Sequence, residues 1–167
     1  MVSTADVVVD GFERVRQAAS AAVSGADERV LTARLTPDAN SVAWLVWHLA
    51  RVQDDHVADA AGTDQVWTSQ GFIDRFGLPF SPEAHGYGHS SSDVAKVKGI
   101  PASLLEEYVD AVTDATVAYV RGLSDADLDR VVDDRYDPPV TLAVRLVSVI
   151  SDDLQHAGQA AFVRGCL

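Results

Sequence analysis

Four long segments of this chain carry apolar residues at steps of three and four, the spacing that places them on one face of an α-helix. In the first segment, from about residue 4 to Gly25, this stripe consists of Val8, Phe12, Val15, Ala19 and Ala22. No segment alternates convincingly between apolar and polar residues, so the sequence predicts no β-sheet. Because each amphipathic helix must bury its stripe against another element, the pattern predicts an all-α fold, a four-helix bundle.

Capping residues locate the other three helices. Their starts are predicted at Asn40 or Ser41, at Pro101 or Ser103, and at Asp137 before two prolines, and their ends at Ala60 or Gly62, Gly122 and Gly165. Between the second and third helices lies a long connection rich in Gly, Ser and His, with short helical pieces expected around residues 64–76 and 92–98. A connection of that length is uncommon in a bundle and usually covers something.

Length and charge limit the classes of function. The 167 residues suit one domain, residues 1–167, and a hydrophobic fraction of 47% is too high for a disordered chain. The formal net charge of −12 excludes nucleic acid and anionic membranes as partners, because both require basic patches. The sequence has neither a long apolar run nor the features of a signal peptide, so we expect a cytoplasmic protein without a membrane segment. The lone Cys166 has no partner for an internal disulfide.

Three side chains with metal-binding chemistry fall on the predicted helices. Asp152 and His156 stand four residues apart, which puts a carboxylate and an imidazole on one helix face. His48 sits among tryptophans and leucines on a helix expected to point into the bundle. A buried carboxylate is costly unless it is paired or coordinates a cation, and Asp152 falls in a stripe expected to face the core. That stripe consists of Val149, Asp152, His156, Ala160 and Val163.

A shared divalent ion would satisfy all three groups at once. Two imidazoles and one carboxylate leave open coordination positions, as in catalytic metal sites, so His48, Asp152 and His156 are the candidate ligands. Taken alone, a histidine such as His48 is more often a hydrogen-bonded core residue than a ligand, and the other two residues could form an ordinary surface pair.

The other histidines fit a metal site less well. His85 and His89 also stand four apart, but the glycines between them disfavour a helix, and we expect a flexible, solvated loop that at most lines the mouth of a site. His56 and Asp55 lie too far along their helix from the first candidate ligand to share its ion. Asp55 is instead expected to pair with Arg51, four residues earlier, or to orient a neighbouring group.

Arg145 lies three turns before His156 on the same side of the last predicted helix. It is a candidate for binding a carboxylate of a substrate inside the bundle. The alternative is that its long side chain extends past the start of the helix to solvent.

Two stretches carry a resemblance to a known family. The run Asn-Ser-Val-Ala-Trp-Leu-Val-Trp-His-Leu-Ala-Arg-Val-Gln-Asp-Asp-His and the closing run Asp-Asp-Leu-Gln-His-Ala-Gly-Gln-Ala-Ala-Phe-Val-Arg-Gly are similar to the DinB/YfiT-like superfamily. The likeness spans nearly the whole chain and is strongest to the branch that includes the mycothiol-dependent maleylpyruvate isomerase metal-binding domain. It implies a bundle in up-down-down-up order, often a homodimer, with a metal site between the second and fourth helices.

The resemblance also implies a ligand set. Members commonly use three histidines, and the isomerase branch has a glutamate at the middle position. Carried over to this chain, the first ligand is His48, the third is His156, and the middle position is Asp152, which departs from both patterns but keeps a carboxylate. Zn²⁺ is the expected ion, and Ni²⁺, Fe²⁺ and Mn²⁺ also suit such a site.

Two hypotheses about function follow from these observations. The resemblance implies a metal-dependent thiol S-transferase or isomerase that uses mycothiol as co-substrate with a small electrophile, and in which the metal activates the thiol. The alternative is a non-catalytic metal-binding or stress-associated dimeric bundle, because a fold alone does not specify an activity.

Overall fold

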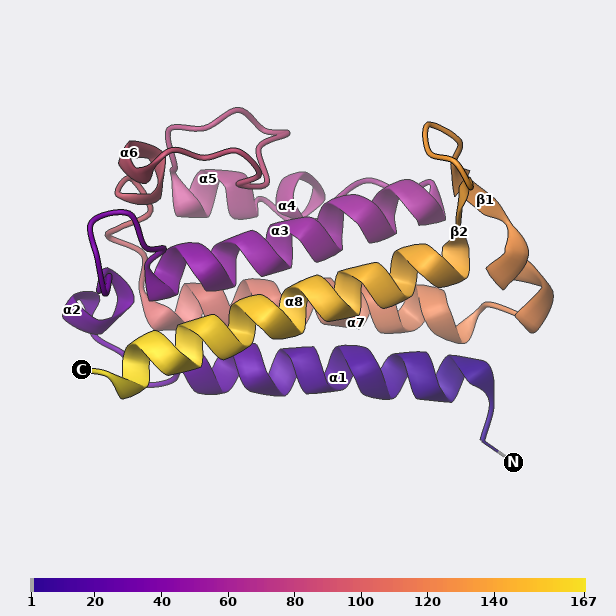
Figure 1. Ribbon diagram of the computed structural model, residues 1–167, viewed down its shortest axis with the longest axis horizontal. Coiled ribbons are helices and arrows are strands. Elements are labelled where there is room, and N and C mark those ends of the chain that lie inside the picture. The colour runs from indigo at the N-terminus through magenta and orange to yellow at the C-terminus, as the bar shows by residue number, and fades with distance from the viewer. Residues whose placement is uncertain (1) are drawn as a thin grey trace.

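The structure is a computed structural model that describes residues 2–167. Its four long helices are α1 (Thr4–Val23), α3 (Val42–Ala61), α7 (Ala102–Arg121) and α8 (Leu142–Gly165). They lie side by side, with α1 and α8 running in one direction and α3 and α7 in the other (Figure 1). The all-α four-helix bundle is therefore confirmed, and the helices follow the up-down-down-up order that the resemblance implies.

Local capping explains where the helices begin and end. The Ser41 hydroxyl accepts a hydrogen bond from the backbone N–H of Trp44 at 3.2 Å, which satisfies an otherwise free donor in the first turn of α3. Gly62 ends the same helix in the left-handed conformation, at a φ of 69°. Pro101 precedes the first residue of α7, as the sequence indicates.

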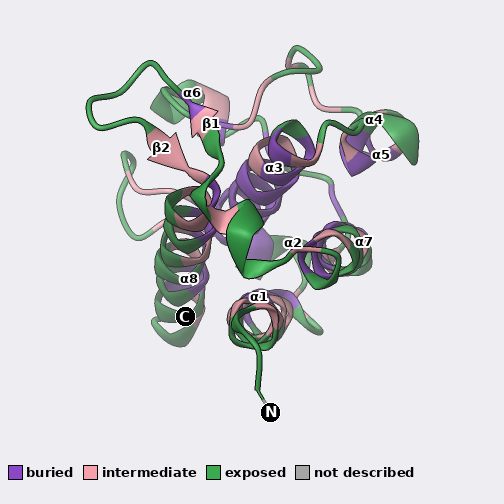
Figure 2. Cartoon of the chain, turned by 90° about the vertical axis from the view of Figure 1, so that its right-hand side faces the viewer, coloured by how far each residue is buried: buried purple, intermediate pink, exposed green. Residues whose placement is uncertain are grey.

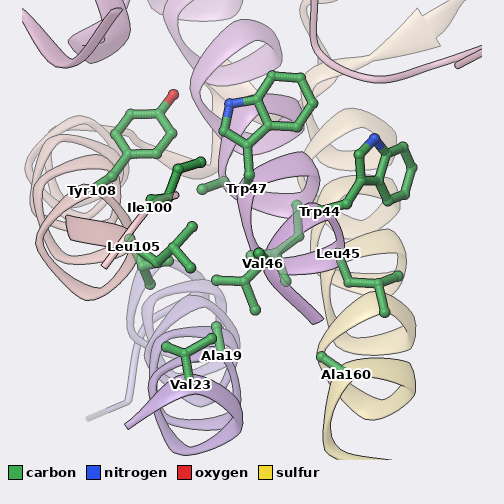
Figure 3. Close-up of a cluster of buried hydrophobic side chains, with 14 of the residues drawn as sticks. Ala19, Val23, Trp44, Leu45, Val46, Trp47, Ile100, Leu105, Tyr108 and Ala160 are labelled. Carbon is green, nitrogen blue, oxygen red and sulfur yellow. The ribbon is translucent and has the colours of Figure 1, made fainter. Parts of the chain in front are cut away.

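The core lies where the four long helices meet, and α3 is its most buried member (Figure 2). Trp44 and Trp47 of α3 and Leu105 of α7 are almost fully buried, and Figure 3 shows how these side chains fill the space between the helices. A helix that is apolar nearly all the way round is stable in water only when other elements cover every face. For α3 these elements include α8, α7 and the connection that follows α3.

The connection between α3 and α7 lies over α3 (Figure 1) and contains the short helices α4 (Val66–Ser69), α5 (Phe72–Phe76) and α6 (Ser91–Val94). The expected short helical pieces are therefore present. Trp67, Phe72 and Phe76 form an aromatic cluster with Tyr108 of α7, with ring centroids 4.9 to 5.7 Å from the Tyr108 ring. A further short helix, α2 (Glu28–Leu31), lies between α1 and α3.

The prediction of no sheet was wrong, and so was the predicted start of the last helix. After a 3₁₀ helix, η1 (Asp125–Asp129), strands β1 (Val131–Asp133) and β2 (Val140–Thr141) form a small antiparallel hairpin. Strands this short leave no detectable period of two in a sequence. Two successive prolines follow Asp137, and because a residue before proline avoids the helical region, this stretch forms bends between the two strands and does not start the helix. The helix starts instead at Leu142, where the Thr141 hydroxyl accepts from the N–H of Val144 at 3.4 Å.

Candidate metal centre

Helices α3 and α8 bring His48, Asp152 and His156 together, and we refer to these three residues as the triad. Each offers one ligand atom, and all three atoms lie within 4.8 Å of one another. The imidazole rings of His48 and His156 meet edge to face, with centroids 4.7 Å apart. Asp152 joins them because it stands one helical turn before His156 on the same face of α8.

The ring of His48 is held in one orientation by its neighbours. It is buried, it stacks on Trp44 at a centroid distance of 4.6 Å, and its Nδ1 is hydrogen-bonded to the backbone carbonyl of His85. A carbonyl only accepts, so Nδ1 carries the proton and Nε2 keeps its lone pair for a ligand. Burial lowers the pKa of His48 to about 4, so the ring is neutral at physiological pH, the form that binds a metal.

The second histidine is oriented by its own helix. His156 Nδ1 lies 2.8 Å from the backbone carbonyl of Asp152 and 3.3 Å from its carboxylate oxygen Oδ2. Burial alone would lower the pKa of His156, but its contacts with the carboxylate and the backbone carbonyl of Asp152 outweigh it, and the net shift is upward. The contact of the carboxylate with His156, at 3.3 Å, lowers the pKa of Asp152. Asp152 is therefore a carboxylate at neutral pH.

One oxygen of Asp152 is left over by these contacts. Oδ2 is close to His156 Nδ1, but that N–H is directed at the backbone carbonyl of Asp152. Oδ2 therefore has no hydrogen-bond partner among the described residues, and it is also shielded from solvent. An ionised oxygen in that position is unfavourable unless a cation is nearby. Zinc ligands lie about 2.0–2.1 Å from the ion and therefore roughly 3.3 Å from one another. The three ligand atoms of the triad lie within 4.8 Å of one another, so they need to approach by at most about 1.5 Å. The residues therefore fit a divalent ion.

Asp152 lies beside His48 as expected, but the sequence-based reason for choosing it, a position in the stripe that faces the core, was wrong. The buried stripe of α8 runs through Val149, Asp153 and Ala157, and the side chain of Asp152 is 40% exposed. Asp153 is fully buried, neither of its oxygens has a hydrogen-bond partner within residues 2–167, and burial raises its pKa well above the ordinary value. The sequence did contain the signal, because Asp153 stands four residues from both Val149 and Ala157.

The stretch from His85 to His89 was expected to be flexible and solvated, but the structure packs it against α3. We call residues 82–89 the covering loop. His89 stacks on Trp47 with centroids 5.8 Å apart, and its Nδ1 accepts from Trp44 Nε1 at 3.2 Å. Neither His85 nor His89 belongs to the triad, although His85 supplies the carbonyl that holds His48.

A glycine allows the covering loop to come this close. Gly86 is buried and has a φ of 99°, a conformation that residues with a side chain rarely adopt. A Cβ atom at this position would stand 2.7 Å from His48 Nδ1 and 3.0 Å from Trp44 Cζ2. The glycines that suggested flexibility therefore include one, Gly86, that is needed for the close contact with His48 and Trp44.

Arg51 anchors the start of the covering loop from inside the protein. Its side chain is fully buried, and it donates to the carbonyls of Ala84 at 3.1 Å and Pro82 at 3.2 Å and to Gln65 Oε1 at 2.8 Å. Its carboxylate neighbour is Asp54, at 3.6 Å. The expected pair of Arg51 with Asp55 was therefore wrong, and Asp55 accepts from Gln65 Nε2 at 2.7 Å instead.

A cavity of about 220 Å³ opens beside the triad, and we refer to it as the triad cavity. Its wall includes His48, Asp152, Val149, His85, Tyr87, His56 and Arg145. Arg145 does not extend to solvent: its side chain is 17% exposed and donates to Asp133 Oδ2 at 3.0 Å. His56 Nδ1 lies 3.4 Å from Arg145 Nη1, and burial and the positive charge of Arg145 lower the pKa of His56. Both side chains thus face the same space as the triad.

None of the helices described is both long and apolar enough to cross a lipid bilayer. The chain matches a family model described as mycothiol S-transferase over residues 7–167. No protein with a curated description matches the sequence. Among solved structures, the chain is similar to a conserved protein from Enterococcus faecalis, with 29% identity, a TM-score of 0.91, and coverage of 98% of this chain and 96% of that one.

Proposed function

Because the chain belongs to the mycothiol S-transferase family, we propose that it is a metal-dependent transferase that joins the sulfur of mycothiol to a small electrophile. The observation that carries this proposal is the triad itself: three potential ligands converge, and two of them, His48 and Asp152, line a cavity. One shielded carboxylate oxygen of Asp152 lacks a partner among the described residues. A closed structural site would have four protein ligands, whereas three leave a position for a substrate.

In this proposal His48, Asp152 and His156 hold the ion. A divalent ion bound there would supply Lewis acidity, which lowers the pKa of a thiol from about 8.5 so that thiolate is available at neutral pH. Zn²⁺ is the ion we propose. Ni²⁺, Fe²⁺ and Mn²⁺ are alternatives, because aspartate and imidazole bind all of them.

The chain's own groups position the reactants. The carbonyl of His85 and the ring of Trp44 fix His48, so the ligand does not have to reorganise during the reaction. Arg145 carries five N–H groups, and its contacts with Asp133 and His56 leave others to bind a carbonyl or carboxylate of the substrate in the triad cavity. His85 and Tyr87 of the covering loop and Val149 of α8 line the triad cavity, where they contact a bound substrate.

We also propose that the protein works in the cytoplasm, where low-molecular-weight thiols are kept reduced, and that it is a homodimer. Val147, Leu154 and Phe162 lie on the outer face of α8 with exposed fractions of 62%, 39% and 65%. A row of exposed apolar side chains on one helix supports a contact with a second copy. The oligomeric state can be measured by light scattering coupled to size-exclusion chromatography.

The experiment that tests the proposed function is a thiol panel. Untagged protein is loaded with zinc and incubated with monobromobimane or chlorodinitrobenzene and, in separate reactions, mycothiol, bacillithiol, glutathione or no thiol. We expect turnover with mycothiol that His156→Ala abolishes together with the bound metal. Gln155→Ala is the matched control, because Gln155 is exposed and adjacent on α8 but bonds only within its own helix.

Two results would contradict the proposal. Turnover that is absent with every thiol, or equal in wild type and His156→Ala, would favour a metal-binding module without catalysis. Elemental analysis of the same samples separates the two cases, because a non-catalytic module would still lose its metal in His156→Ala.

A further inference from the structure

A second and larger concavity adjoins the triad cavity. It measures about 840 Å³ and lies between the C-terminal part of α3 and the β1–β2 hairpin, and we call it the hairpin hollow. His56 and Arg145 line both spaces, so the hollow and the triad cavity meet at these two side chains. Figure 1 shows the hairpin standing next to the end of α3, on the side of the bundle where α8 begins.

The sizes of the two spaces match two parts of one molecule. Mycothiol consists of an N-acetylcysteinyl group joined to a glucosamine–inositol unit. The triad cavity, at 220 Å³, is smaller than the roughly 300–1,000 Å³ that is usual for ligand sites, so it suits the cysteinyl end of the molecule. The adjoining hairpin hollow, at 840 Å³, falls within that range. It therefore has room for the sugar half.

The hollow is lined by groups that bind hydroxyls. Asp55 and Asp59 present carboxylates to it, Gln65 and Thr63 present an amide and a hydroxyl, and the carboxylate of Asp133 forms part of its wall. Carboxylates accept strong hydrogen bonds from hydroxyl groups, which a polyol offers in number.

Asp133 is the most firmly held of these groups. It is buried, Arg135 Nη2 and Arg145 Nη2 lie 2.8 and 3.0 Å from its Oδ2, and the hydrogen bonds from Arg135 hold its pKa well below the ordinary range. Its Oδ1 accepts from the backbone N–H and from Nε of Arg135, at 3.1 and 2.9 Å, so its four acceptor sites are filled. Asp133 therefore holds Arg135 and Arg145 at the wall of the hollow and leaves the binding of hydroxyls to the other carboxylates of the hollow. Its position on β1, next to Arg145, places it where the hollow meets the triad cavity.

The charge of the hollow selects against anionic thiols. Its aspartates are Asp55, Asp59, Asp133 and Asp134, and its only arginines are Arg135 and Arg145 within residues 2–167. The excess of negative charge repels a ligand that carries carboxylates in this position. Bacillithiol ends in malate and glutathione carries two carboxylates, whereas the sugar half of mycothiol is uncharged.

We propose that the hairpin hollow is the subsite for the uncharged, polyhydroxylated half of the thiol co-substrate, with Asp55 and Asp59 as its hydroxyl acceptors. This inference rests on the proposed function, because it assumes that the thiol's sulfur is directed at the triad. It assigns to the hairpin a role in choosing among thiols, separate from the chemistry at the metal. Arg145 then stands at the junction of the two halves of the ligand.

The first test uses the headgroup without its sulfur. N-Acetylglucosaminyl-inositol is titrated at millimolar concentrations into ¹⁵N-labelled wild-type protein, and amide shifts are followed by NMR. We expect shifts at residues 59–65 and 131–135, around the hollow, and none around α6. Malate is titrated in the same way as an anionic comparison, and it should leave the chemical shifts of these amides unchanged.

The second test compares two thiols in a matched pair of variants. Thr63→Trp puts a large side chain into the hollow, and Thr68→Trp is its control, because Thr68 is exposed on α4 and does not line the hollow. The ratio of kcat/KM for mycothiol to that for N-acetylcysteine should fall about tenfold or more in Thr63→Trp, as expected for the loss of at least one strong hydrogen bond. It should stay within about twofold in Thr68→Trp.

The outcomes separate this inference from the proposed function. If mycothiol is consumed but the headgroup shifts no amide of the hollow, or if Thr63→Trp leaves the ratio unchanged, the subsite is refuted and the transferase stands. If the headgroup binds in the hollow and Thr63→Trp prevents it, while no thiol is consumed, the subsite stands and the proposed reaction fails. The titration of wild-type protein decides the question even if a variant does not fold.

Discussion

Replacing Arg51 by methionine should both destabilise the protein and weaken its hold on metal, although Arg51 touches none of the triad. Methionine has a similar length and leaves little empty space, so the change removes mainly the guanidinium and its hydrogen bonds. Arg51 is fully buried and bonds Ala84, Pro82 and Gln65, and it is the cation beside the buried Asp54.

The expected size follows from these contacts. Removing one partner of a buried, hydrogen-bonded ion pair costs roughly 3–5 kcal/mol, because the other charge and the freed carbonyls are left in the interior. Asp54 keeps the N–H groups of Val66 and Trp67 and the hydroxyl of Tyr108 as donors, each at 2.8 Å, so we place the loss near the lower end, about 3 kcal/mol. With a urea m-value of about 2 kcal/mol/M, the unfolding midpoint should fall by about 1.5 M.

The effect on metal passes through the covering loop. Without Arg51 the carbonyls of Pro82 and Ala84 lose their anchor, and the His85 carbonyl that orients His48 is released. Loss of a group that orients a metal ligand typically costs 10–100-fold in affinity, and we expect a zinc Kd higher by about that factor. Zinc affinity is measured by competition with a chromogenic chelator, under conditions where both proteins are folded.

Arg75→Met is the control for this substitution. Arg75 is 45% exposed and pairs with Glu107 on the surface, and exposed pairs are worth about 0–1 kcal/mol. An Arg51→Met protein that unfolds at the same urea concentration as Arg75→Met, or that binds zinc as tightly as wild type, would refute the reasoning.

Three further substitutions test other parts of the site. Asp152→His should retain zinc, whereas Asp152→Ala should bind it at least about tenfold more weakly, and equal affinity of Asp152→Ala and wild type in chelator competition would show that the aspartate is not a ligand. Asp153→Asn should remove a pH dependence of the free energy of unfolding, because burial raises the folded-state pKa of Asp153. The contribution of Asp153 to stability is intact below the unfolded pKa of about 3.9. It is lost, by up to about 1.4 kcal/mol per pH unit, as pH rises towards the folded pKa. Urea unfolding of chelator-treated wild type and Asp153→Asn should therefore diverge with rising pH, and parallel curves would contradict this. Gly86→Ala should lower the free energy of unfolding by about 1–2 kcal/mol, since its φ is 99° and its Cβ would contact His48, and an unchanged urea midpoint would argue against the close contact.

Much of the fold could be predicted from sequence because helices follow local rules. The three- and four-residue spacing of apolar residues, Ser41 and Gly62 at the ends of α3, and Pro101 before α7 all act within a few residues. The pairing of Asp152 with His156 is local in the same sense, because a spacing of four places both on one face of any helix.

Other features were decided by contacts between distant parts of the chain. The covering loop has no regular pattern of its own, and its shape follows from Arg51 and from the close approach of Gly86 to His48. The hairpin is too short to carry a regular pattern, and its Asp133 becomes significant only because the fold sets it beside Arg145. A sequence pattern carries no information about such pairs, since neither partner's local preferences depend on the other.

The rotation of α8 shows the boundary between the two kinds of information. The sequence determined by itself that residues 142–165 could form an amphipathic helix, but Asp152 and Asp153 are adjacent and either could have faced the core. Only packing against α3 and α1 set the angle that buries Asp153 and leaves Asp152 at the edge of the cavity beside His48. An α-helix turns about 100° per residue, so a shift of one residue in the buried stripe exchanges a core position for a position in the site.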